Sequence, residues 1–311
     1  MSLDVEKEIN EVRGFNNLEL LANQVVEGFI SGLHKSPFHG FSAEFAEHKI
    51  YNQGESTKHI DWKLFAKTDK LYTKRYEEET NLRCHLIIDN SSSMHFPKIN
   101  SFSLNTFNKI GFSVLATAAI MNLMKRQRDA VGMSIYGEDY EFYAAEKGSE
   151  RHHRMLLNEL NSLLRQQPLQ TGTSSVEHLH LIAEKLKRRS LVFLFSDMFQ
   201  TSIEQEEIFE ALQHLKYKKH EVILFHTFDK KLELQLDFEN KPTRFFDVET
   251  GEYIDLYAEH VKENYTKAVG DFFKELELRC GQYRIKYVPS DINENFNKIL
   301  LTYLLERQRF G

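Results

Sequence analysis

Apolar and polar positions follow two repeating patterns in the larger part of the chain, and they predict alternating strands and helices from Arg83 onward. Nearly continuous apolar runs, such as "SLVFLFSD" and "HEVILFHTF", are typical of strands buried on both faces of a sheet. Apolar residues at helical spacing predict helices at about Phe102–Lys125, Arg151–Leu164 and Glu204–Tyr217. This succession indicates βαβ units, so we expect an α/β fold: a doubly wound, mainly parallel sheet with helices on both faces.

Shorter patterns complete the predicted domain. "AVGMSIYGEDYEFYAAE" and "RFFDVETGEYIDL" each predict a hairpin, the first turning at Gly137–Asp139 and the second around Glu249–Gly251. The remaining expected elements are a strand at Cys84–Asp89, a helix at Val176–Leu186, a long helix at about Ala258–Arg279, a strand at Tyr283–Val288 and a final helix from about Ile292.

The chain before Arg83 follows neither pattern for most of its length. An amphipathic helix is predicted over Asn17–Lys35. The segment after it is rich in charged and aromatic residues, and we expect it to be irregular apart from a short strand at Lys70–Tyr76. We therefore divide the chain into an N-terminal flank, residues 1–81, and an α/β domain, residues 82–311. The hairpin near residues 243–255 is expected to be an insertion in that domain.

Hydroxyl and carboxylate side chains cluster after two of the predicted strands and in one loop. Asp89, Ser91 and Ser93 form D-x-S-x-S after the first strand, Thr173 lies in "TGTSS" before a helix, and Asp197 ends "SLVFLFSD". Ligands of doubly wound sheets bind at the carboxyl ends of the strands, so we expect these five side chains to converge there. Oxygen ligands of this kind suit a hard divalent cation, Mg²⁺ (or Mn²⁺). Neutral hydroxyls leave much of the cation's charge uncancelled, so we expect an acidic side chain of a partner protein to complete the site.

Two other interpretations of the same residues stay open. Asp and Ser also cluster after strands because they form turns and cap helices, which would need no metal. Alternatively, the ion could activate water in a metal-dependent hydrolase, although no residue of the sequence stands out as its general base. The sequence lacks the motifs of P-loop ATPases, dinucleotide-binding proteins, nucleophile elbows and zinc proteases. We therefore favour a non-enzymatic binding module and assign no catalytic residue.

The five-residue set resembles the metal-ion-dependent adhesion site of von Willebrand factor A domains. In that family the serines and the threonine bind Mg²⁺ or Mn²⁺, and the aspartates act directly or through water. The resemblance implies that Asp89, Ser91, Ser93, Thr173 and Asp197 hold such an ion for metal-dependent protein–protein interaction.

A second resemblance is more specific and extends from about Gly40 to the C-terminus. "YNQGESTKHIDWKLFAK" is similar to the signature Y-x-x-G-[DE]-x-x-[RK]-x-I-D-W-x-x-x-A-[RK] of the bacterial family called domain of unknown function fifty-eight. "DVETGE" resembles the same family's hairpin. Members are typically encoded beside MoxR-type AAA+ ATPases, so the resemblance implies such an ATPase as a partner in assembling or activating other complexes. The matching residues are Tyr51, Gly54, Ile60, Asp61, Trp62 and Ala66, with Glu55, Lys58 and Lys67 as charge-conserving departures.

Composition narrows the classes of protein to consider. The formal net charge of −6 argues against a nucleic-acid binder, which normally carries a basic excess. Cys84 and Cys280 are the only cysteines, so neither a disulfide framework nor a zinc-type spacing is present. The most apolar stretch, Gly111–Met124, is shorter than the roughly 20 residues of a membrane span. "MSLDVEKEINEVRGF" is not typical of a signal peptide, and we expect a cytoplasmic protein without membrane insertion.

Three further features are interpreted as structural. Trp62, the single tryptophan, is predicted to be a packed aromatic anchor rather than part of a docking surface. His178 and His180 lie two positions apart on a helix, diverge by about 200° and cannot bind one ion together. "RHHR" at Arg151–Arg154 is interpreted as an exposed helix start.

Overall fold

The computed structural model describes eleven stretches of the chain: residues 18–33, 45–50, 62–76, 82–99, 106–137, 140–165, 175–187, 189–199, 202–238, 241–246 and 252–294. Contacts divide the chain into two compact units. The larger contains residues 1–32 and 82–311, and the smaller contains residues 33–81.

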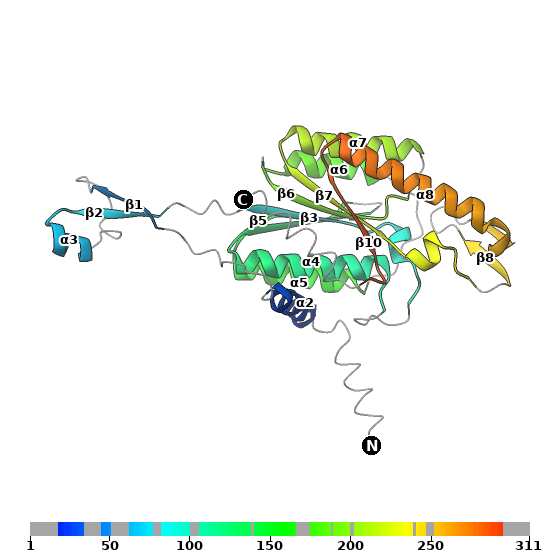
Figure 1. Cartoon of the computed structure of the whole chain (residues 1–311), viewed down its shortest axis with the longest axis horizontal. Coiled ribbons are helices and arrows are strands. Elements are labelled where there is room, and N and C mark those ends of the chain that lie inside the picture. Colours follow the sequence, from blue (N-terminus) through cyan, green and yellow to red (C-terminus); the bar gives the residue numbers. More distant parts are fainter. Residues whose placement is uncertain are drawn as a thin grey trace, which may run out of the picture. The chain divides into compact units, whose positions relative to one another are not determined.

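The larger unit is built on one six-stranded sheet in the order β10-β7-β6-β3-β4-β5 (Figure 1). Neighbouring strands are parallel except β4 and β5, which pair antiparallel at the edge. In chain order this arrangement is 3-2-1-4-5-6, the doubly wound order, so the predicted α/β fold class is confirmed. The strands are β3 (Arg83–Asp89), β4 (Ala130–Tyr136), β5 (Tyr140–Lys147), β6 (Leu191–Ser196), β7 (Glu221–Phe228) and β10 (Lys286–Asp291).

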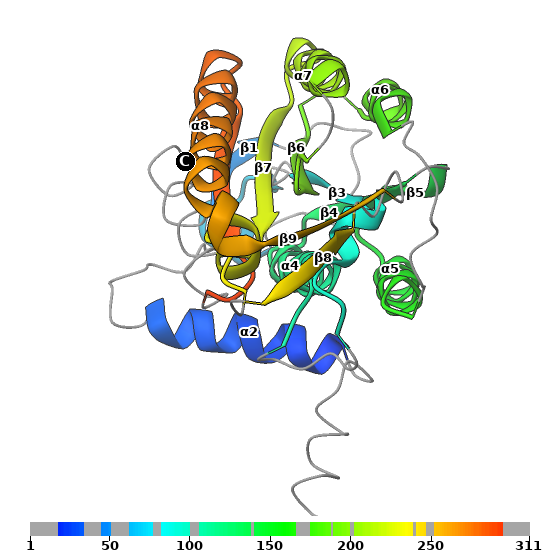
Figure 2. The same cartoon turned by 90° about the vertical axis from the view of Figure 1, so that its right-hand side faces the viewer.

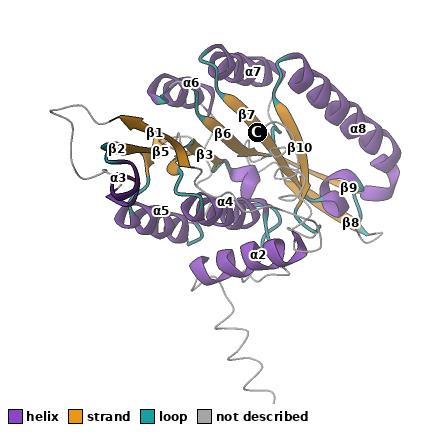
Figure 3. Ribbon diagram, turned by 60° about the vertical axis from the view of Figure 1, so that its left-hand side comes forward, coloured by secondary structure: helices purple, strands orange, loops and turns teal. Residues whose placement is uncertain are grey.

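Helices cover both faces of this sheet (Figure 2). On one face lie α2 (Leu18–Leu33), α4 (Lys109–Arg126) and α5 (Glu150–Leu163). On the other lie α6 (Ser175–Lys185), α7 (Ser202–Tyr217) and α8 (Ala258–Gln282), as the ribbon in Figure 3 also shows. Helix α4 is buried on almost all sides, which explains why its sequence is apolar with small polar residues instead of amphipathic.

Alternate residues of the central strands enter two separate cores. In β3, Leu86 and Ile88 pack into the core under α4, whereas Ile87 packs into the core under α6 and α7. Successive strand side chains point to opposite faces, so a strand covered on both faces must be apolar at every position. Each fully buried side chain of this size contributes about 1.5–3 kcal/mol through removal of apolar area from water.

A helical segment and a two-stranded hairpin follow β7 before the long helix α8. A π-helical segment, η4 (Lys230–Leu234), was not predicted. The second predicted hairpin is present as β8 (Pro242–Phe246) and β9 (Tyr253–Tyr257), joined by a bidentate pair between Arg244 and Asp255. Its turn lies outside the described residues.

The smaller unit contains more structure than the sequence predicted. The expected strand is present as β2 (Tyr72–Tyr76), and it pairs antiparallel with an unpredicted strand, β1 (Phe45–Ile50). An unpredicted short helix, α3 (Trp62–Thr68), lies between them in the chain. Trp62 is 62% exposed and contacts the Phe65 ring edge-on, so its prediction as a packed anchor is wrong.

Several boundaries and one surface prediction also need correction. Helix α4 begins at Lys109, not near residue 102, because the Asn108 side chain caps it by accepting the Gly111 N–H. Strand β10 begins after Arg284, whose φ of 55° ends the preceding helix. His152 and His153 are buried, so "RHHR" is not an exposed start throughout. The final helix predicted from residue 292 falls mostly beyond the described residues.

The N-terminal helix belongs with the α/β core. Leu18, Leu21, Ala22 and Val26 of α2 pack into the same buried cluster as α4 and α5. The proposed division at residues 81 and 82 stays a prediction about domains. None of the described helices combines the length and apolar character that a bilayer crossing requires.

Candidate functional site

Two carboxylates end adjacent strands at the point where the order of the sheet reverses. Strands β3 and β6 are parallel neighbours, with Ile88 opposite Phe195. Asp89 is the last residue of β3, and Asp197 follows the last residue of β6. From β3 the chain builds the sheet first toward β4 and then, from β6, in the opposite direction. Ligands of doubly wound folds bind at such a reversal point. Four of the five predicted residues are brought to this edge.

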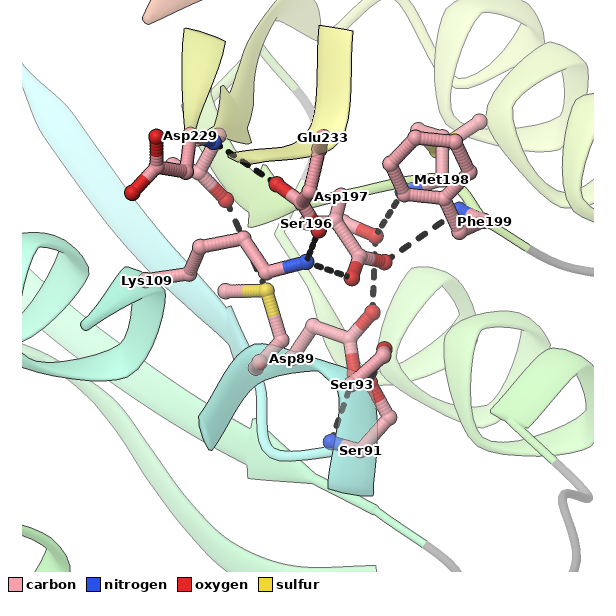
Figure 4. Close-up of polar contacts among 12 residues, drawn as sticks. Asp89, Ser91, Ser93, Lys109, Ser196, Asp197, Met198, Phe199, Asp229 and Glu233 are labelled. Carbon is pink, nitrogen blue, oxygen red and sulfur yellow. Dashed lines mark hydrogen bonds and ion pairs between the residues drawn. The ribbon is translucent and has the colours of Figure 1, made fainter. Parts of the chain in front are cut away.

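The loop after β3 is shaped by the Asp89 carboxylate (Figure 4). Its Oδ1 accepts the Ser91 backbone N–H at 2.9 Å, the local turn expected of an aspartate in this position. Its Oδ2 accepts the Ser196 hydroxyl at 2.7 Å, which ties the loop to the next strand. Ser91 Oγ and Ser93 Oγ lie 3.1 Å apart. Asp89 therefore forms a turn, as one interpretation expected, and also joins two strands.

The loop after β6 holds Asp197 in a strained turn. Met198 has a φ of 54°, a left-handed conformation that is unfavourable for a residue with a branched or bulky side chain. Asp197 Oδ1 accepts the Phe199 N–H at 3.2 Å, and its carbonyl oxygen lies 2.8 Å from His226 Nε2. These contacts fix the carboxylate next to Asp89, and strain of this kind occurs at functional sites.

The electrostatics of Asp89 are unfavourable to its charged form. Burial, and next the negative charge of Asp197, raise the pKa of Asp89 from its usual 3.8 to about 6. Burial and then the charge of Asp89 also raise the pKa of Tyr136, at the end of β4, well above its usual value. Two ionised carboxylates facing each other in a buried position favour a cation between them.

A buried lysine that no sequence pattern indicated already supplies one positive charge. Lys109 is 1% exposed, and its Nζ lies 2.7 Å from Asp197 Oδ2 and 2.5 Å from Glu233 Oε1. Burial would lower the pKa of Lys109, but the charges of Asp197 and Glu233 raise it above the usual value, so the ammonium form is retained. Glu233 comes from η4, and its Oε2 accepts the Asp229 N–H at 2.7 Å.

Charge and ligand type together decide whether a divalent cation fits. Asp89, Asp197 and Glu233 carry three formal negative charges against the one positive charge of Lys109, which leaves an excess of two. Among the residues that the structure describes, no three His, Cys, Asp or Glu side chains are grouped to hold a metal ion. A metal would therefore depend on the hydroxyls of Ser91 and Ser93. Hydroxyl and carboxylate oxygens are ligands that Mg²⁺ accepts, so the residues fit the ion.

One predicted ligand cannot be placed. Thr173 lies outside the described residues, and so does most of the "TGTSS" loop. The helix that follows, α6, begins at Ser175, one residue before the predicted start.

His85, His95, His178 and His180 each contact groups other than the two serines. His95 Nε2 lies 2.9 Å from the Asn90 side-chain oxygen. His85 belongs to a second polar cluster, 2.8 Å from Glu146 Oε1 through Nδ1 and 2.7 Å from Ser134 Oγ through Nε2. His178 Nδ1 contacts the Gly137 carbonyl, and the His180 ring packs against His214.

Comparison with known proteins shows the family. The chain belongs to the family described as "Protein of unknown function DUF58", whose model matches residues 47–272. The chain is also similar to Uncharacterized protein Rv1480 of Mycobacterium tuberculosis (strain ATCC 25618 / H37Rv), with 26% identity over 140 residues. An uncharacterized protein of Mycobacterium bovis matches equally well. Each match covers 45% of this chain and 42% of the relative, so the chain spans less than half the length of these relatives.

Solved structures give more distant similarities. The conserved hypothetical protein BatB from Bacteroides thetaiotaomicron matches with a TM-score of 0.43 and 15% identity, over 74% of this chain and all of that chain. An aerotolerance-related membrane protein from Bacteroides fragilis matches with a TM-score of 0.40 and 15% identity, over 72% of this chain and 99% of that chain. The fold assignment rests on the strand order instead.

Proposed function

We propose that this chain is a protein-interaction module of the von Willebrand A type with a metal-ion-dependent adhesion site. Asp89, Ser91, Ser93 and Asp197 would hold Mg²⁺ (or Mn²⁺), with Thr173 as a further ligand by resemblance alone. The ion would supply a positive charge for an acidic side chain of a partner protein. The chain's own residues would position that partner at the reversal point of the sheet.

The observation that carries this proposal is the excess of buried negative charge at that point. A rise in the pKa of Asp89 from 3.8 to about 6 corresponds to roughly 3 kcal/mol of unfavourable interaction for the charged form. Burial is the larger cause of this rise, and the charge of Asp197 adds to it. A divalent cation at this point would offset both, because it supplies positive charge to the two carboxylates.

For the partner we propose a MoxR-type AAA+ ATPase, acting with this chain to assemble or activate other complexes. Family membership supports this choice, because members are typically encoded beside such ATPases. We propose the cytoplasm as the compartment, and the positions of the two cysteines agree with it. Cys84 and Cys280 are buried in different cores, on opposite faces of the sheet, so they do not form a disulfide.

A capture experiment tests the proposal. The immobilised chain is incubated with the ATPase in Mg²⁺ and then washed with EDTA. We expect retention in Mg²⁺, release by EDTA and loss of retention in Asp89→Ala. Asp255→Ala, which removes an exposed carboxylate of the hairpin, is the matched control and should behave as wild type. Retention that persists in EDTA would contradict the proposal.

The alternative is a metal-dependent hydrolase, and one observation now favours it. Glu233 is a carboxylate near the site whose pKa is raised, first by burial, as expected of a general base. Both of its oxygens accept hydrogen bonds, from Lys109 and from the Asp229 N–H, so we rank catalysis second. Phosphatase and esterase screens with Mn²⁺ decide between the two. Turnover that disappears in Asp89→Ala would establish the hydrolase.

A further inference from the structure

Lys109 occupies a position that its own helix does not favour. It is the first residue of α4, where the partial positive charge of the helix N-terminus disfavours a cation. Its ammonium is nonetheless buried, with the Phe96 and Phe199 rings 5.8 and 5.4 Å from it. Among the described residues, the carboxylates of Asp197 and Glu233 supply the negative charge that compensates this placement, and the faces of the two rings add to it, so the reason for Lys109 lies at the site and not in the helix.

We propose that Lys109 is a built-in cation that competes with the divalent ion for Asp197 and thereby sets the affinity of the site. This inference rests on the proposed function and adds a residue that determines its strength. The ammonium bonds to Asp197 Oδ2 at 2.7 Å, on the carboxylate that the ion also needs. A divalent ion that binds the Asp197 carboxylate would therefore compete with the Lys109 ammonium for it.

Glu233 gives the ammonium a second acceptor. Its Oε1 lies 2.5 Å from Lys109 Nζ, and its Oε2 is fixed by the Asp229 N–H. If Asp197 were to bind a divalent ion, Glu233 would still neutralise the lysine, so the buried ammonium would keep a counter-charge. Glu233 would thus reduce the free-energy cost of moving the Asp197 carboxylate from the ammonium to the ion.

The arrangement gives two substitutions effects of opposite sign. Lys109→Met, which keeps much of the volume and removes the charge, releases Asp197 and should raise Mn²⁺ affinity about tenfold. Glu233→Gln leaves the ammonium dependent on Asp197 and should lower the affinity roughly three- to tenfold. Lys109→Arg retains the charge and should stay closest to wild type. Lys125→Met, on the same helix but in a half-exposed pair with Glu150, is the matched control and should change nothing.

The measurement is the dissociation constant for Mn²⁺ alone, from the electron paramagnetic resonance signal of the free ion, with circular dichroism to verify folding. A rise in Lys109→Met with a fall in Glu233→Gln supports the inference. Equal affinity in wild type and both variants overturns it while leaving the proposed function intact. If Lys109→Met fails to fold, Lys109→Gln and Glu233→Gln carry the test.

Two other outcomes separate the inference from the proposed function. Binding by Lys109→Met alone would support competition by Lys109 and contradict metal dependence of the wild-type chain. Binding by none of the proteins would contradict both.

Discussion

Strand β3 carries a buried polar cluster near each end, one around His85 and one around Asp89, and the two differ in hydrogen bonding and in charge. Near its start, His85 links Ser134 and Glu146 through its two ring nitrogens, at 2.7 and 2.8 Å. This is the order of nucleophile, base and orienting acid in a catalytic triad. At its end, Asp89 lies in a cluster with no such familiar geometry. The cluster that looks more catalytic is the one that cannot act, because Ser134 and His85 are completely buried within the sheet.

The two clusters differ more clearly in net charge and in satisfied hydrogen bonds than in the arrangement of their side chains. Both nitrogens of His85 have partners, and the approach is so close that a Cβ on Gly132 would lie 2.7 Å from His85 Nδ1. The Asp89 cluster retains two formal negative charges that no described side chain neutralises. A closed network stabilises the fold, whereas the unbalanced one would be stabilised by the cation that we propose.

The largest expected effect is a loss of stability in His85→Ala without a change in metal affinity. His85→Ala should destabilise the fold by about 3–5 kcal/mol, because it opens a cavity and leaves Ser134 and Glu146 buried without this partner. Urea unfolding measures the loss, and Mn²⁺ affinity of the folded variant should be unchanged. Esterase activity that disappears in Ser134→Ala would contradict a purely structural role for the His85 cluster.

The second expected effect is a pH dependence of the free energy of unfolding, caused by Asp89 at the carboxyl end of β3. Because the folded pKa of Asp89 is raised to about 6, its contribution to stability is fully present below about 3.8 and is lost as pH rises through 6. In EDTA, wild type should therefore lose up to about 3 kcal/mol relative to Asp89→Asn between pH 4 and 7. Urea unfolding of both proteins across this range measures the difference.

His226 titrates in the same range with the opposite sign. Burial is the main cause that lowers the pKa of His226 to about 4, so its contribution is lost as pH falls below 6.5. That contribution is common to wild type and Asp89→Asn and cancels in their difference. A difference that is independent of pH would mean that Asp89 is not under the strain described.

The smallest effect concerns a neutral ligand. Ser93→Ala removes one hydroxyl 3.1 Å from that of Ser91 and should lower Mn²⁺ affinity roughly three- to tenfold, since a neutral oxygen contributes less than a carboxylate. Ser162→Ala, at an exposed position of α5, is the matched control. Calorimetric titration gives both constants. Equal affinities in the two variants would remove Ser93 from the site.

The strands and the two strand-end carboxylates could be predicted because each depends on neighbouring residues. A continuous apolar run that stops at Asp89 or before Asp197 marks both a buried strand and its carboxyl end. Lys109 and Glu233 could not be found in this way. Lys109 lies 88 residues before Asp197 and 124 residues before Glu233 along the chain. The tertiary fold brings them together by placing α4 and η4 beside Asp197.

Other misses have similarly physical causes. The start of α4 is set by the Asn108 cap and not by the apolar residues before it, which extended the predicted helix too far. Strand β1 and helix α3 lie in a segment of mixed charge and aromatics with no clean period, so pattern alone gave no signal. Exposure of Trp62 depends on that unit's fold and is not visible in its sequence.

Direct measurement of Mn²⁺ binding to wild type and Asp89→Ala by electron paramagnetic resonance tests the central claim. One ion per wild-type chain, with affinity at least about a hundredfold weaker in Asp89→Ala, is the predicted result. Absence of binding to the wild-type chain, or equal binding to both proteins, would contradict a cation site at the end of β3.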